Sequence, residues 1–118
     1  DAQNELNNKK EDADEVTSIY QTSDVNAAFN YGDSDMALKI IENIIKTKVA
    51  NGKTEKEATS AIRSSMTSYW KPLYKEACKN RDTAEKNRIK KILVASGMYG
   101  KASSVDIVLE AWAADKDK

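Results

Sequence analysis

The chain has 118 residues, of which 40% are hydrophobic and 32% are charged, and its formal net charge is zero. This length suits a single domain with a modest core. The sequence contains no histidine and only one cysteine, Cys78. Histidine-based triads, histidine-ligated metal sites and an internal disulfide are therefore excluded. The densest apolar stretch, residues 40–45, is interrupted by Glu42 and Asn43, so no membrane span is expected.

The even net charge hides an uneven distribution along the chain. Residues 1–24 carry seven acids and two bases, whereas residues 71–101 carry nine bases and three acids. The two regions are expected either to attract each other or to serve separate partners. We predict a flexible or linker-like acidic segment over residues 1–23, a helical domain over 24–114 and a frayed end over 115–118.

Two helices are predicted in the first half of the domain. The first spans about 24–31, with Ser23 as its N-cap and Gly32 at its end. The second spans about 35–51, because apolar residues recur there at intervals of three and four. Its apolar stripe comprises Ala37, Ile40, Ile41, Ile44, Ile45 and Val49.

A third helix is predicted to begin after Thr54, which forms a capping-box pattern with Glu57. Pro72 follows in the same apolar pattern. Proline disfavours the helical conformation in the residue before it and suits a first helical turn. We therefore expect this helix to end or kink near Ser68, and a fourth helix to begin near Trp70.

The last two helices are predicted over 83–96 and 105–114. The first of them should end at Gly97 in a left-handed conformation, and the second should be capped by Ser103 or Ser104. The fold class is therefore all-α, a compact bundle of five to six short helices. The residues expected in its core include Ile41, Ile44, Ile62, Leu73, Ile92, Leu93 and Leu109.

A faint internal repeat runs through the chain. Residues 26–33 resemble residues 74–82, and the offset is 49 positions for both the aligned alanines and the aligned aspartates. Each copy reads as a helix, a tight turn with aspartate, and a second helix. The pattern is consistent with two related helical hairpins, and shared hairpin geometry alone is the competing explanation.

No motif in the sequence points to catalysis or to a cofactor. Residues 52–54 read Gly-Lys-Thr, but the phosphate-binding loop they resemble needs an earlier glycine where Thr47 stands, and a preceding strand. Cys78 lies on an apolar stripe with no histidine to activate it, so a packed thiol is expected. We therefore predict that the protein is not an enzyme and holds no cofactor.

The C-terminal half resembles a helical module found at the C-terminal ends of large, poorly characterised proteins of phages and prophages of gut bacteria. The resemblance rests on the string Tyr-Trp-Lys-Pro-Leu-Tyr at 69–74 and on the turn Ser-Gly-Met-Tyr-Gly at 96–100. It implies a virion-associated role, in the virion or in the cytoplasm of the bacterial host. It supplies no catalytic or binding residues. A start at Asp1 rather than at methionine is also expected of a processed product or of a piece of a longer polypeptide.

Two functions remain open from the sequence. The leading hypothesis is a non-enzymatic interaction or structural domain that docks to a protein partner or to itself, through the aromatics Trp70, Tyr99 and Trp112. The alternative is a nucleic-acid-binding module in which aromatics and bases of 71–101 contact bases and phosphates. Its contact residues would be Lys75, Lys79, Arg81, Lys86, Arg88, Lys90 and Lys91.

Overall fold

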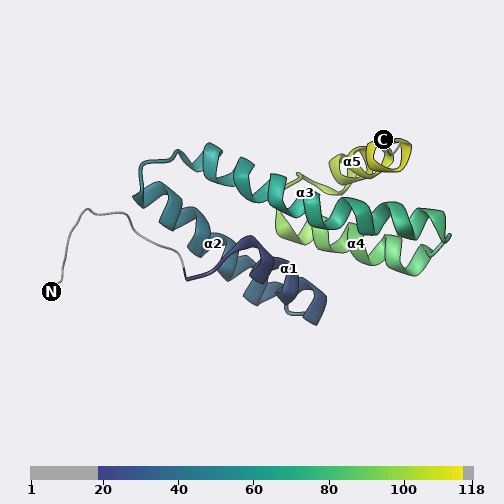
Figure 1. Cartoon of the computed structure of the whole chain (residues 1–118), viewed down its shortest axis with the longest axis horizontal. Coiled ribbons are helices and arrows are strands. Elements are labelled where there is room, and N and C mark those ends of the chain that lie inside the picture. The colour runs from purple at the N-terminus through teal and green to yellow at the C-terminus, as the bar shows by residue number, and fades with distance from the viewer. Residues whose placement is uncertain (1–18, 116–118) are drawn as a thin grey trace, which may run out of the picture.

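The computed structural model describes residues 19–115, which form five α-helices and no strand (Figure 1). The all-α prediction is confirmed. Most of the predicted acidic segment, and all but the first residue of the predicted frayed end, lie outside the described residues. The helices are α1 (Thr22–Tyr31), α2 (Ser34–Ala50), α3 (Glu55–Lys79), α4 (Thr83–Ser96) and α5 (Ala102–Ala114).

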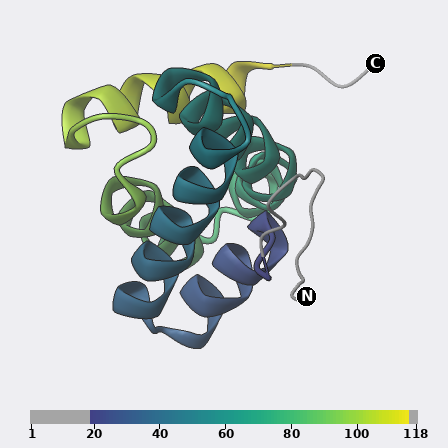
Figure 2. The same cartoon turned by 90° about the vertical axis from the view of Figure 1, so that its left-hand side faces the viewer.

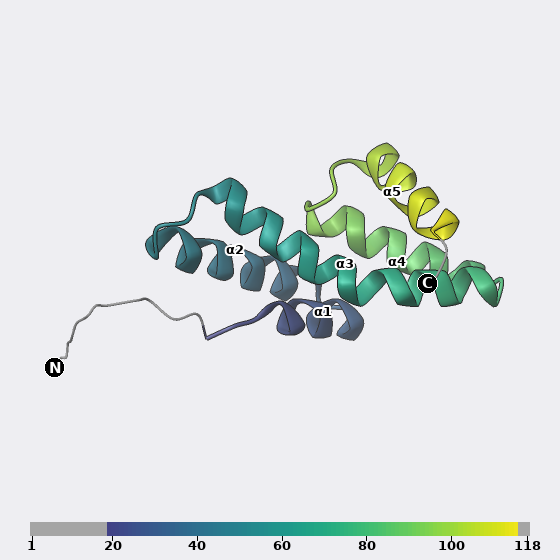
Figure 3. The same ribbon diagram turned by 45° about the horizontal axis from the view of Figure 1, so that its top comes forward.

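Helix α3 is the axis of the bundle. Its 25 residues make it the longest helix, about 38 Å at 1.5 Å per residue. Figures 1 and 3 show α2 beside its N-terminal half and α4 and α5 beside its C-terminal half, with α1 near its middle. Seen from one end, the helices do not form a flat layer: α2 lies in front, α5 along the top and α4 at the left (Figure 2). One long helix thus joins the two ends of the molecule.

The apolar faces of all five helices meet in one core cluster. Six of the seven residues expected in the core are buried, with exposed fractions of 7% or less. The prediction for Leu73 is wrong, because its side chain is 37% exposed. The inward face of α3 here is set by Trp70, Tyr74 and Ala77, and Leu73 points to its edge. The six confirmed residues are Ile41, Ile44, Ile62, Ile92, Leu93 and Leu109.

The predicted end of the third helix near Ser68, with a new helix from Trp70, is also wrong, since α3 continues through Pro72 without interruption. A proline inside a helix removes one backbone hydrogen bond. Buried residues lie on both sides of it, however: Met66 and Trp70 before it, and Tyr74 after it, at intervals of four. Their common burial favours one continuous helix over the local preference of the proline.

Two helices begin earlier than predicted. The N-cap of α1 is Gln21 rather than Ser23, and the Asp24 carboxylate accepts a hydrogen bond from the Gln21 amide at 2.8 Å. The N-cap of α5 is Lys101 rather than either of the predicted serines, with no side-chain cap bond. The capping box of Thr54 and the left-handed Gly97 are confirmed. Start positions are the weakest part of a sequence prediction, because several neighbouring residues can serve as caps.

The turns of the two predicted hairpins have the same hydrogen bonds. Asp33 donates its amide to the carbonyl of Ala28 at 2.9 Å, and Asp82 donates to Ala77 at 2.8 Å. Each aspartate side chain then accepts from the backbone amide three residues later, which caps the next helix. The two hairpins are therefore related in turn geometry at the predicted offset, although the helix-ending bond is a common one that also closes α2.

We expect Leu93→Ala to lower the free energy of unfolding by about 2–5 kcal/mol, because Leu93 is fully buried and its truncation leaves a cavity. The control, Leu73→Ala, should cost about 1 kcal/mol or less, because that side chain is partly in solvent. Urea unfolding followed by circular dichroism measures both. Equal losses in the two variants would contradict the assigned core.

Arg81→Gly should raise the free energy of unfolding. Arg81 has φ of 56°, while the equivalent position in the first hairpin is Gly32 with φ of 90°. A left-handed backbone costs a non-glycine residue roughly 1–2 kcal/mol, and glycine loses about 0.5–1 kcal/mol through chain entropy, so a net gain of about 0.5–1 kcal/mol is expected. Arg81→Ala is the control, because it removes the charge and keeps the strain. A glycine variant no more stable than the alanine variant would contradict the backbone strain assigned to Arg81.

Candidate partner-binding surface

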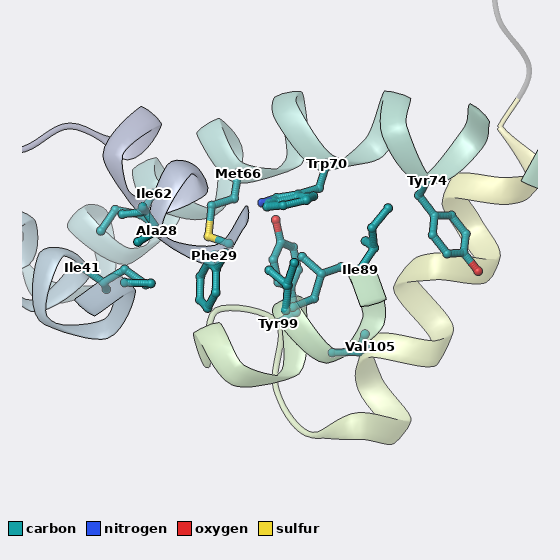
Figure 4. Close-up of a cluster of buried hydrophobic side chains, with 14 of the residues drawn as sticks. Ala28, Phe29, Ile41, Ile62, Met66, Trp70, Tyr74, Ile89, Tyr99 and Val105 are labelled. Carbon is teal, nitrogen blue, oxygen red and sulfur yellow. The ribbon is translucent and has the colours of Figure 1, made fainter. Parts of the chain in front are cut away.

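The three aromatics predicted to contact a partner lie in the core instead. Trp70 is fully buried, and Tyr99 and Trp112 are 9% and 7% exposed. Two of them have their polar atoms bonded inside the protein: Trp70 Nε1 donates to Asn26 Oδ1 at 3.0 Å, and the Tyr99 hydroxyl lies 2.8 Å from the Thr67 hydroxyl. Figure 4 shows Trp70 and Tyr99 within the cluster of buried side chains. The prediction that they form an exposed contact surface is wrong.

Two other tyrosines are exposed and line a hollow between α1 and α3. Tyr31 is 89% exposed and Tyr69 is 40% exposed. The hollow has a volume of about 430 Å³. We term it the tyrosine groove, lined by Ser23, Asn26, Ala27, Asn30, Tyr31 and Tyr69.

Local sequence explains why these tyrosines face outward. Tyr31 is the last residue of α1, directly before the left-handed Gly32 that turns the chain away. Tyr69 precedes the buried Trp70, and adjacent residues on a helix point about 100° apart, so both cannot point into the core. The rings of Tyr69 and Trp70 pack edge to face, with centroids 4.8 Å apart. This contact and the neighbouring core fix the orientation of Tyr69.

A polar network holds the wall of the groove. Asn30 Nδ2 donates to the Tyr69 hydroxyl at 2.8 Å, and Arg88 Nη1 donates to Asn30 Oδ1 at 3.2 Å. Arg88 also donates to both carboxylate oxygens of Glu85, at 2.7 and 2.8 Å, and lies 5.8 Å from the centre of the Trp70 ring. The hydrogen bonds from Arg88 lower the pKa of Glu85. Helices α1, α3 and α4 are therefore joined under Tyr69 by a network that contains the Arg88–Glu85 ion pair.

Sequence reasoning named neither Tyr31 nor Tyr69 among the partner-contact residues. One available signal was the position of Tyr31 beside a helix-ending glycine, where a side chain has few neighbours. The other was the doublet at 69–70, in which only one ring can occupy the buried stripe. Which of the two is buried depends on the path of α3 through Pro72.

The bases proposed for nucleic-acid binding do not share one face. Lys90 pairs with Asp106 of α5, with Nζ and Oδ1 2.8 Å apart. Arg88, two residues earlier, points instead toward α1, where it meets Asn30. Lys91 is exposed between these directions. Helix α4 thus spreads its positive charge around its surface, and two of its bases are already paired.

Three of the remaining bases, Lys75, Lys79 and Lys86, line two further hollows that contain acids. Lys86 and Lys90 line one hollow with Asp106 and Glu110. Lys75 and Lys79 line the other, beside Pro72, Glu76 and Cys78. Arg81 is exposed in the turn between α3 and α4. The acids in these hollows reduce the attraction that either would exert on a phosphate backbone.

Comparisons of the chain with protein-family models, curated proteins and solved structures found no match. Within residues 19–115, no three side chains of histidine, cysteine, aspartate or glutamate gather to hold a metal ion. None of the helices described is long and apolar enough to cross a membrane. The geometry of the surface is therefore the basis for any functional assignment.

Asn26→Ala should destabilise the protein by about 1–3 kcal/mol, because it leaves the buried Trp70 N–H without its acceptor. The control is Asn30→Ala, which removes an exposed amide of the same chemistry one turn later and should cost less than about 1 kcal/mol. Thermal unfolding monitored by tryptophan fluorescence measures both. A loss at Asn30 as large as that at Asn26 would contradict the assignment of Asn26 as the internal partner.

Proposed function

We propose that this chain is a non-enzymatic helical interaction domain that docks to a protein partner through the tyrosine groove. The observation that carries the proposal is the pairing of a nearly fully exposed Tyr31 with a fixed Tyr69 across a hollow of about 430 Å³. Exposed aromatic rings next to a concave surface are typical anchors of protein interfaces.

The network under the groove supports this role. Tyr69 is held by Asn30 and by edge-to-face contact with Trp70, so little side-chain entropy is lost when a partner covers it. Tyr31 supplies apolar area, and the amides and hydroxyl along α1 supply hydrogen-bonding groups. Such a surface fits an apolar side chain of a partner together with its backbone polar groups.

The resemblance of the C-terminal half to modules of large phage-encoded proteins adds a context to the proposal. On that basis the domain is the terminal part of a larger virion-associated protein, and the partner is another protein of the virion or of the infected cell. Docking of a terminal domain requires no catalytic group, which agrees with the chemistry of its motifs.

The nucleic-acid alternative draws on the nine bases among residues 71–101. Lys91 and Arg81 are exposed and available to phosphates. Against it, Arg88 and Lys90 are paired with Glu85 and Asp106, and the bases point in several directions. Interaction with protein is the function that the surface supports better.

A photo-reactive phenylalanine derivative in place of Tyr31 tests the docking role in bacterial cells. Irradiation should link the chain to one protein of defined mass, whereas the same group in place of Ile107, 69% exposed on α5, should not. With that protein purified, Tyr31→Ala should weaken binding by about 2 kcal/mol or more. Equal adducts from both positions, or unchanged affinity in the alanine variant, would refute docking at the groove.

Fluorescence anisotropy with short labelled DNA and RNA strands tests the alternative. For docking, the double variant Lys86→Glu/Lys91→Glu should keep its affinity for the captured protein, and the wild-type chain should not bind the strands. For nucleic-acid binding, affinity should fall steeply between about 50 and about 200 mM salt, and charge reversal should abolish it.

A further inference from the structure

Helix α2 carries apolar side chains on a second face, outside its buried stripe. Leu38 and Val49 are 41% and 45% exposed, and Ile45 between them is half-buried. Their spacings of seven and four residues place the three side chains on one side of the helix. We term these three residues the α2 seam. In Figure 2, α2 lies across the front of the bundle.

An ion pair flanks the α2 seam. Lys46 Nζ lies 3.6 Å from Glu42 Oε2, and the two side chains are 75% and 66% exposed. A pair of this length and exposure contributes little to stability. Both charged groups are therefore available to a partner of opposite charge at small cost.

The α2 seam and its charges are arranged almost symmetrically about residue 44. Glu42 and Lys46 each lie two positions from it, on opposite sides, and Leu38 and Val49 lie at nearly equal distances in opposite directions. Suppose two α2 helices pair antiparallel about a twofold axis at this point. Glu42 of each copy then faces Lys46 of the other, and Leu38 faces Val49. The charged and apolar groups of one α2 helix therefore match those of a second copy. An interface between identical subunits related by a twofold axis requires such a match.

We propose that the α2 seam binds a second copy of this chain in an antiparallel, twofold-symmetric pair. One helix from each copy buries less area than the roughly 1,200 Å² of a standard interface, so the dimer is weak and depends on concentration. The α2 seam is separate from the tyrosine groove, which is lined by residues of α1 and α3. Self-association and partner docking can therefore be tested, and can fail, independently.

Sedimentation equilibrium of the 118-residue chain, from about 10 µM to about 1 mM, measures the association constant. Glu42→Lys places lysines against lysines at both ends of the pair, and Lys46→Glu does the same with acids. Each single variant should associate at least about fivefold more weakly than wild type, whereas the double variant Glu42→Lys/Lys46→Glu should return to within about twofold. Because both altered side chains, Glu42 and Lys46, are exposed, circular dichroism should show the same fold in every variant.

The apolar part of the α2 seam has its own pair of variants. Val49→Ser should weaken association by about fivefold or more, whereas Ile107→Ser, at a more exposed apolar residue of α5, should leave it unchanged. A chain that stays monomeric throughout the concentration range overturns the proposal. Equal weakening of the dimer by both single charge variants and by the double variant also overturns it. So does an Ile107→Ser variant that weakens the dimer as much as Val49→Ser does.

Discussion

The buried indole of Trp70 is the contact on which the rest of the structure depends. It lies near the middle of α3, fully buried, with its N–H bonded to Asn26 of α1 and the Arg88 guanidinium of α4 near its ring. A large ring with one polar atom can occupy a core only if that atom finds a partner, because an unmet buried donor costs free energy. The requirement fixes α1 against α3 at one rotation and places Arg88 beside them. The groove wall of Asn30 and Tyr69 follows from that arrangement.

The same constraint divides the aromatic residues between stability and recognition. Trp70, Tyr99 and Trp112 have internal partners and fill the core, so they are not free to contact another protein. Tyr69 precedes Trp70, which already occupies the core. Tyr31 precedes Gly32, where the chain turns away from the bundle. The candidate binding surface is therefore a consequence of core packing: the residues that the core leaves at its edge are those a partner can reach.

Charge follows a similar division. The bases of 71–101 give this segment a strong positive balance in the sequence, but in the fold Arg88 neutralises Glu85 and supports the groove, and Lys90 joins α4 to α5 through Asp106. Only part of the charge is left exposed, and it is spread over several directions. A charged segment thus says little about a charged surface until the partners of each side chain are known. On α2, by contrast, an exposed ion pair beside apolar residues keeps both charges accessible.

The sequence by itself determined the helical class, most of the core, and the ends of helices marked by strong local signals, such as the capping box of Thr54 and the left-handed Gly97. These features depend on interactions within a few residues, where spacing and backbone preference act directly. Tertiary structure decided the continuity of α3 through Pro72, since burial on both sides of the proline outweighed its local preference. It also decided which aromatic of the 69–70 doublet became core and which became surface. Trp70 became core because it makes contacts with α1 and α4, which are distant in sequence.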